Sequence, residues 1–350
     1  MPKFWSEMAE RAVPYTPGEQ PKGQVFIKLN TNESPYPPSP RLKEVLDDTA
    51  DQRLYPDPTA EGLRSRLAAL YGLDMDEVFV GNGSDEILAF TFMGLMSPKE
   101  PVSYPDITYS FYTVWAQLFH IPEQIIPLRE GFRLALDDYE GGTGPVVIAN
   151  PNAPTGIALP RERLKAFLEQ HPDRLLIVDE AYVDFGGESM VPYIHEYPNL
   201  LVIQTFSKSR GLAGARLGFA MGQRQLIEAL LRIKNSFNSY TISRRSLQLG
   251  CASLEDTAYF EETRGRIMRT RDSLIRELRE KGALVTDSKA NFLWLSCPGL
   301  SGQELQQALR ERGILIRHFN QPLIKDYVRV TIGSEEDMET FKNTLFEIWN

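Results

Sequence analysis

The sequence predicts an α/β fold built around a mostly parallel sheet. Two observations lead to this prediction. Short, continuous apolar runs alternate with segments of helical periodicity through the middle of the chain, and several runs end in polar residues. Strands that are buried on both faces read as continuous apolar runs, and helices between them return the chain so that the strands lie parallel. The predicted strands of this sheet are 78–80, 101–104, 124–128, 146–149, 175–178, 200–205 and 217–221.

Helices are expected before and between these strands. Leu63, Leu67 and Leu70 mark one helix face, because residues three or four positions apart lie on the same side of a helix. A helix from Pro40 to Ala50 is expected as well, since proline is favoured in the first turn. The other elements expected in this part of the chain are helices at 4–13, 85–95, 110–119 and 161–170, a strand at 25–29 and a Pro-rich loop at 30–40.

The pattern changes after Gln223, where we expect a smaller α+β domain. Long charged segments predict helices at 223–235 and 241–281, followed by strands at 291–295, 314–316 and 328–331 and a last helix at 335–349. The predicted division is an N-terminal arm at 1–35, a large domain at 36–240 and a small C-terminal domain at 241–350.

Composition narrows the class of protein. The 350 residues carry a net charge of −9, which argues against a nucleic-acid-binding protein with its usual basic face. No apolar run approaches the length of a membrane span, and the first residues do not resemble a signal peptide. Two distant cysteines fit a reducing cytoplasm, and four scattered histidines give no reason to expect a metal site. We therefore expect a cytoplasmic protein with neither a nucleic-acid nor a membrane partner.

One lysine stands out at the end of a predicted strand. The apolar run 200–205 leads to Ser207 and Lys208, and Arg216 follows after several small residues. Burial disfavours the charged form of a lysine, and a neutral amine is a nucleophile towards carbonyl groups. Read alone, the stretch slightly favours Lys208 as an exposed lysine in a loop, since lysines are common there.

Three other strand ends carry polar residues, and ligands of open α/β sheets bind at such ends. Ser84 and Asp85 begin a predicted helix, whose backbone N–H groups could bind an anion. Asn152 follows the strand 146–149, and Asp179 follows the strand 175–178, with Tyr182 close behind. Each has an ordinary explanation alone, as a helix cap, a turn residue or a core tyrosine.

Together these strand ends fit pyridoxal 5′-phosphate. That cofactor needs a lysine for its aldehyde and a carboxylate at its ring nitrogen. It also needs hydrogen-bonding partners for its phenolic oxygen and a phosphate site. Lys208 and Asp179 would meet the first two needs, and Asn152 with Tyr182 the third. The phosphate ligands would be Ser84, Asp85, Ser207, Arg216 and, as a weaker candidate, Thr205.

The segments Asn150–Gly156, Asp179–Tyr182 and Ser207–Lys208 with Arg216 resemble, in order and spacing, the signature of the fold-type-I pyridoxal-phosphate aminotransferases of class I/II. Over essentially its full length the chain is most similar to the histidinol-phosphate aminotransferases of that family. The resemblance implies an aspartate-aminotransferase-like large domain with a mostly parallel, seven-stranded sheet. The other segments that carry it are 14–18, 29–35, 55–57, 83–86, 211–218, 291–292 and 327–333.

The resemblance also implies further roles. Tyr109 would stack on the cofactor ring, and Tyr55 would reach the cofactor phosphate of the partner subunit in a homodimer. Arg329 would bind the distal anion of the substrate, with help from Arg317. Tyr15 and Asn32 would close the site from the N-terminal segment.

The implied reaction is amino-group transfer, with Lys208 and Asp179 as catalytic residues together with Tyr182. The expected substrates are histidinol phosphate with 2-oxoglutarate, giving imidazole-acetol phosphate and glutamate in histidine biosynthesis. Three alternatives stay open at this point: an aromatic amino-acid aminotransferase, a threonine-phosphate decarboxylase, and a binding module without turnover. The intact set of Lys208, Asp179 and Arg216 argues against the last of these.

Overall fold

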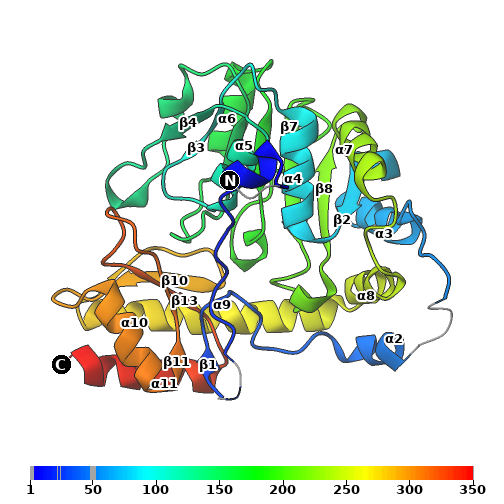
Figure 1. Ribbon diagram of the computed structural model, residues 1–350. Helices are drawn as coiled ribbons and strands as arrows, with labels where there is room; N and C mark the ends of the chain where they lie inside the picture. Colours follow the sequence, from blue (N-terminus) through cyan, green and yellow to red (C-terminus); the bar gives the residue numbers. More distant parts are fainter. Residues whose placement is uncertain (1–3, 22, 24, 48–52, 350) are drawn as a thin grey trace.

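The computed structural model describes residues 4–21, 23, 25–47 and 53–349. Its centre is a seven-stranded sheet in the order β2-β8-β7-β6-β5-β3-β4, in which β8 is antiparallel to both neighbours and the other pairs are parallel (Figure 1). The predicted fold class is therefore confirmed. The strands are β2 (Val78–Gly81), β3 (Val102–Pro105), β4 (Glu123–Ile126), β5 (Val146–Ala149), β6 (Leu176–Asp179), β7 (Leu200–Thr205) and β8 (Gly218–Gly222).

The sheet is buried on both faces, which is why its strands read as apolar runs. Alternate residues of a strand point to opposite faces. Val146 and Ile148 pack into one core cluster with helices α3, α6 and α8, and Val147 packs into another with α4, α5 and α7. The helices are α3 (Glu61–Tyr71), α4 (Gly83–Leu95), α5 (Phe111–Leu118), α6 (Arg161–Gln170), α7 (Arg224–Phe237) and α8 (Arg244–Glu255).

The C-terminal part forms a separate four-stranded sheet in the order β12-β13-β10-β9, with all of its pairs antiparallel (Figure 1). Helices α9, α10 and α11 supply residues to its core cluster. The elements are α9 (Thr257–Glu280), β9 (Leu284–Val285), β10 (Phe292–Ser296), α10 (Gly302–Glu311), β11 (Ile314–Leu315), β12 (Arg317–His318), β13 (Val328–Thr331) and α11 (Glu335–Trp349).

The N-terminal segment connects the two parts. Helix α1 (Glu7–Arg11) lies against α5, and the chain then crosses to β1 (Ile27–Lys28), which pairs in parallel with β11 (Figure 1). A short 3₁₀ turn, Pro40–Leu42, and helix α2 (Lys43–Asp47) follow. The predicted end of that helix, at residues 48–50, lies outside the described residues.

Two predictions for the C-terminal part need correction. The expected single helix at 241–281 is divided at Asp256, whose side chain accepts a hydrogen bond from the backbone N–H of Tyr259 and so caps α9. The expected strand at 314–316 ends one residue early, as β11, and a second strand, β12, begins at Arg317 in a different sheet. The proposed domain boundaries at residues 35 and 240 stay a prediction.

Buried Arg271 in α9 links the two parts of the molecule. Its Nη1 donates to the backbone oxygen of Phe185, which lies beyond β6, at 2.7 Å, and to that of Ala290, which precedes β10, at 3.0 Å. Hydrogen bonds from a charged donor to buried carbonyl groups are strong because the alternative is an unsatisfied polar group. In the described part of the chain, no helix is long and apolar enough to cross a membrane.

Candidate active site

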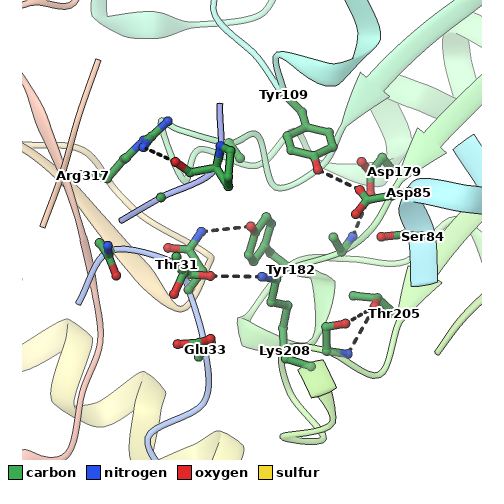
Figure 2. Close-up of a pocket in the computed structure, with 18 of the residues that line it drawn as sticks. Thr31, Glu33, Ser84, Asp85, Tyr109, Asp179, Tyr182, Thr205, Lys208 and Arg317 are labelled. Carbon is green, nitrogen blue, oxygen red and sulfur yellow. Dashed lines mark hydrogen bonds between the residues drawn. The ribbon is translucent and has the colours of Figure 1, made fainter. Parts of the chain in front are cut away.

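A cavity of about 460 Å³ opens at the carboxyl ends of strands in the seven-stranded sheet (Figure 2). Its walls come from the N-terminal segment, from the ends of β6 and β7, and from β12 and β13. Thirteen of the fifteen residues predicted from the sequence line it: Tyr15, Asn32, Ser84, Asp85, Tyr109, Asp179, Tyr182, Thr205, Ser207, Lys208, Arg216, Arg317 and Arg329. The structure thus brings these side chains together, whereas Asn152 and Tyr55 lie outside the lining.

Lys208 lies just beyond the end of β7, and its amine points into the cavity (Figure 2). Its Nζ donates to the backbone oxygen of Thr31 at 3.4 Å and lies 5.7 Å from the centre of the Tyr182 ring. Both contacts are with uncharged groups. Among the residues that the structure describes, the amine therefore has no direct ion pair, which leaves it free to act as a nucleophile or base.

Asp179 ends β6 and is only 5% exposed. Burial raises the pKa of its carboxyl to about 6, while hydrogen bonds from the Tyr112 hydroxyl (2.8 Å) and the Ala181 backbone N–H (3.2 Å) act to lower it. Within the described residues, this carboxylate has no counter-ion at hydrogen-bond distance. It would strongly favour a cationic group, such as a protonated ring nitrogen, that enters the cavity beside it.

Tyr112 is a site residue that the sequence analysis missed. It is wholly buried in α5, and burial together with the charge of Asp179 raises the pKa of its phenol well above the usual range. The phenol therefore stays protonated and donates to the carboxylate. The available signal was weak: Tyr112 lies close to Tyr109 in the sequence, but Tyr109 precedes α5, so the two share no helix face.

The N-terminus of α4 forms one end of the cavity. Asp85 accepts a hydrogen bond from the Tyr109 hydroxyl at 2.7 Å and forms a 3.3 Å ion pair with Arg216 (Figure 2). A Cβ on Gly83 would lie 2.5 Å from Arg216 Nη2, and one on Gly218 would lie 2.5 Å from the backbone nitrogen of Ser84. Only glycine lets the helix start, the guanidinium and β8 approach so closely. The result is a compact anion site.

The hydroxyls of Thr205 and Ser207 lie next to this anion site. Thr205 Oγ1 accepts from the Ser207 backbone N–H at 3.1 Å and lies 3.0 Å from Ser207 Oγ and 3.1 Å from the Leu217 backbone oxygen. Its one proton is therefore used within the protein. The Ser207 hydroxyl contacts only Thr205 among the described groups and can turn its proton towards a ligand, so the structure favours Ser207 over Thr205 as a phosphate donor.

Asn152 lies behind the cavity wall. Its Nδ2 donates to the backbone oxygen of Ile107 at 2.9 Å, and its Oδ1 accepts from Thr108 at 2.8 Å. Its role towards a ligand stays a prediction. Tyr182, by contrast, lines the cavity and accepts a hydrogen bond from Asn32 at 2.9 Å (Figure 2). This contact leaves the Tyr182 hydroxyl proton available to an oxygen in the cavity.

The opposite end of the cavity is basic. Arg317 in β12 and Arg329 in β13 face each other as a cross-strand pair. Burial lowers the pKa of Arg329, and its Nε is a buried donor that has no hydrogen-bond partner in the described part of the chain. An orphaned buried donor in a cavity wall is a strong indication of a missing acceptor. Tyr15 closes this side, with its ring stacked on that of Phe111 at 4.4 Å.

Tyr55 is outside this cavity. Its side chain is 77% exposed and stacks on Tyr240 with the ring centres 4.5 Å apart. Within one subunit it therefore contributes nothing to the site.

The donor set fits pyridoxal phosphate. The cavity offers a lysine amine, a buried carboxylate and a compact anion site between Ser84, Ser207 and Arg216. A glycine-lined cradle at the start of a helix suits a phosphate group, and a carboxylate that lacks a counter-ion suits a pyridinium nitrogen.

We predict that Tyr112→Phe will raise the pKa of Asp179 by about one unit or more. A hydrogen bond to a charged group is worth roughly 1.5–3 kcal/mol, and one pKa unit corresponds to about 1.4 kcal/mol. The measurement is a pH titration of the aspartate carboxyl ¹³C resonances in the cofactor-free protein.

Tyr104→Phe is the matched control for this titration. Tyr104 is a buried tyrosine whose hydroxyl donates to the carboxylate of Glu123, away from the cavity. The control should leave the Asp179 titration unchanged. An unchanged titration in Tyr112→Phe itself would contradict the proposed electrostatic link.

Comparison with known proteins places the chain in a family. Residues 24–345 match the model for "Aminotransferase class I and II". The histidinol-phosphate aminotransferase 1 of Bradyrhizobium diazoefficiens is 49% identical over 99% of this chain and 100% of its own length. The histidinol-phosphate aminotransferase of Acinetobacter baylyi is 49% identical over 98% of this chain and 96% of its own length.

Solved structures show the same fold. The histidinol-phosphate aminotransferase of Sinorhizobium meliloti, in complex with pyridoxal 5′-phosphate, superposes with a TM-score of 0.85 at 22% identity over 99% of both chains. An aspartate aminotransferase variant of Thermus thermophilus superposes with a TM-score of 0.84 at 20% identity, also over 99% of both chains. At these identities the structures support the fold alone.

The family match covers most of the chain, and the curated relatives match almost all of it. The chain therefore belongs to the aminotransferase class I and II family and is a pyridoxal-phosphate-dependent aminotransferase.

Proposed function

We propose that this aminotransferase transfers the amino group of histidinol phosphate to 2-oxoglutarate, giving imidazole-acetol phosphate and glutamate in histidine biosynthesis. Relatives from Bradyrhizobium, Acinetobacter and two Clostridium species, all 46–49% identical over nearly the whole chain, carry the name histidinol-phosphate aminotransferase. Identity at this level over the full length supports a shared substrate.

The observation that carries the proposal is the pair of arginines at the basic end of the cavity. Arg317 and Arg329 are opposed across β12 and β13, and like charges in that position repel each other. Neither forms an ion pair with an acidic side chain in the described parts of the chain. A phosphate monoester is close to a dianion at neutral pH and would relieve this repulsion, and the distal carboxylate of glutamate would do so in part.

When bound, pyridoxal phosphate supplies an electron sink for the substrate's α-carbon. Ser84, Ser207 and Arg216 would hold its phosphate, and Asp179 would face its ring nitrogen. The chain's own chemistry then depends on Lys208, whose Nζ would act as the base that takes up the proton leaving the α-carbon. The Tyr182 hydroxyl, oriented by Asn32, offers a proton to an oxygen in the cavity. Tyr15 and the N-terminal segment shield these groups from water.

Tyr55 fits a homodimer in which it contacts the partner's cofactor site. The exposed, stacked Tyr55 and Tyr240 would form an aromatic projection on the surface of each subunit. Arg244 donates to the Tyr55 backbone oxygen at 3.0 Å and so fixes the base of this projection. We expect sedimentation equilibrium of the active enzyme to give a dimer. A fully active monomer would contradict this part of the proposal.

The cytoplasm is the proposed location. The net charge of −9 and the scarcity of cysteine support it, as does a biosynthetic reaction on a phosphorylated metabolite.

We predict that Lys208→Ala will lower turnover by at least about a thousandfold. General acid–base catalysis by a positioned side chain contributes about 10²–10⁴ in rate, and the loss of the covalent attachment adds to this. Turnover is measured as glutamate formed from histidinol phosphate and 2-oxoglutarate. Lys165→Ala serves as the control and should be fully active, because Lys165 is a lysine of α6 that contacts the Tyr193 ring away from the cavity. Retained turnover in Lys208→Ala would rule out its role as the base.

We predict that kcat/KM for histidinol phosphate will exceed that for phenylalanine by at least about a hundredfold, because only the former has a dianion to place between the two arginines. Threonine phosphate completes the comparison, since it tests for a decarboxylase. A preference for phenylalanine would overturn the substrate assignment and leave the family assignment intact. Release of CO₂ from threonine phosphate, without formation of glutamate from 2-oxoglutarate, would indicate a lyase.

A further inference from the structure

The two arginines of the basic end are held by uncharged groups. Arg317 donates through Nη2 to the backbone oxygen of Thr16 at 3.0 Å and through Nη1 to that of Pro17 at 3.3 Å. Arg329 donates through Nη2 to the backbone oxygen of Asn30 at 3.2 Å. Carbonyl oxygens orient a guanidinium without cancelling its charge. The pair therefore keeps two positive charges that repel each other across β12 and β13.

A single aromatic ring contacts both guanidinium groups. The centre of the Phe319 ring lies 5.4 Å from Cζ of Arg317 and 5.6 Å from Cζ of Arg329, both within the range of a cation–π contact. Phe319 directly follows β12 and is absent from the cavity lining. It thus contacts the arginines without standing where a substrate binds. The ring is partly buried, which strengthens such contacts because water is excluded from them.

The position of Phe319 is set by an aromatic cluster made of Phe132, Trp294, Phe319 and Tyr327. Fully buried Trp294 contacts Phe319 with 5.9 Å between ring centres and stacks on Tyr327 at 5.4 Å. Phe132, from the loop after β4, packs edge-on against Tyr327 at 4.9 Å and against Trp294 at 6.1 Å. The aromatic cluster therefore joins a loop of the large sheet to the ring that contacts the arginines.

We propose that Phe319 is a positioning residue that holds Arg317 and Arg329 at a fixed separation and so favours a dianionic phosphate group over a carboxylate. Without the ring, each guanidinium keeps its backbone hydrogen bonds, and Arg329 keeps its contact with the Phe292 ring at 5.4 Å. The ring that contacts both guanidiniums is then lost, and their mutual repulsion would increase their separation. A phosphate offers three terminal oxygens that can contact both arginines at once, whereas a carboxylate is satisfied by one of them. This inference rests on the proposed function, because it explains why the enzyme would prefer a phosphorylated substrate.

The test is Phe319→Leu in the holoenzyme, which keeps an apolar side chain but removes the ring face. We expect the KM for histidinol phosphate and the inhibition constant for inorganic phosphate to rise about tenfold, as for the loss of buried cation–π contacts. The kcat should change less than about twofold, and the KM for glutamate should change much less than that for histidinol phosphate. Phe319→Tyr retains a ring and should restore wild-type constants.

Phe132→Leu is the matched control. It makes the same change in the same aromatic cluster, at a residue that contacts Trp294 and Tyr327 but neither arginine. We expect a comparable loss of thermal stability with unchanged constants for histidinol phosphate and phosphate. Equal effects of the two leucine variants on these constants would mean that Phe319 has only a packing role, and would overturn the proposal. An unchanged ratio of the KM values for histidinol phosphate and glutamate in Phe319→Leu would overturn it as well.

The inhibition constant for inorganic phosphate separates this proposal from the proposed function. If the wild-type enzyme did not prefer histidinol phosphate, the substrate assignment would fail. Weaker inhibition by phosphate in Phe319→Leu, but not in Phe132→Leu, would still show that Phe319 holds a dianion site. If phosphate inhibited all variants equally while histidinol phosphate remained the preferred substrate, Phe319 would lose its role and the substrate assignment would stand.

Discussion

The active site depends on the carboxylate of Asp179, which the fold buries even when no cofactor cation lies beside it. Asp179 is nearly inaccessible at the end of β6, and burial raises its pKa to about 6 from an ordinary value near 4. An acid whose pKa is raised by folding destabilises the folded state as pH rises from about 4 to about 6. For Asp179 the cost at neutral pH is on the order of 3 kcal/mol. Tyr112 and the Ala181 N–H limit this cost, and a bound pyridinium would offset it. Binding of the cofactor and stability of the fold are therefore linked.

The basic end of the cavity likewise has charges that a bound ligand would compensate. Arg329 is a buried cation with an orphaned Nε, and Arg317 opposes it across the strand pair. The fold thus keeps a negative centre at Asp179 and a positive one at the arginines apart within one cavity, with Lys208 as the nucleophile. Each centre is incomplete in the free protein. The bound cofactor and substrate would supply the complementary charges. A preformed site of this kind selects ligands that carry those charges.

Much of the fold could be read from the sequence because burial leaves a simple pattern. Strands β7 and β13 and helices α6 and α11 have the predicted bounds, since continuous apolar runs and helical periodicity mark them clearly. The break between α8 and α9 was missed because Asp256 is one polar residue in a charged segment. Helix α10 and the two-residue strand β9 were not predicted, the latter because so short a strand leaves almost no pattern.

The site was less accessible to sequence reasoning wherever a role depends on a distant partner. The strand ends predicted Lys208 and Asp179, but the Tyr112–Asp179 hydrogen bond joins residues that are 67 positions apart. Asn152 was predicted as a cofactor ligand from its place at a strand end, and this role stays a prediction, because its amide hydrogen-bonds to Ile107 and Thr108 in the structure. A strand end specifies the edge of a sheet on which a residue lies. The direction of the side chain is decided by the loops around it.

The pairing of β1 with β11 constrains the order in which the parts of the chain can fold during synthesis. Arg317 reaches the backbone oxygen of Thr16 across 301 positions of sequence, and Arg329 reaches that of Asn30 across 299. On a ribosome the seven-stranded sheet has all its strands long before residues 314–331 emerge. The N-terminal segment must wait for them, so the basic wall and the cover of the cavity form only as synthesis ends. A nascent chain can fold its large sheet while its cofactor site is still open to water.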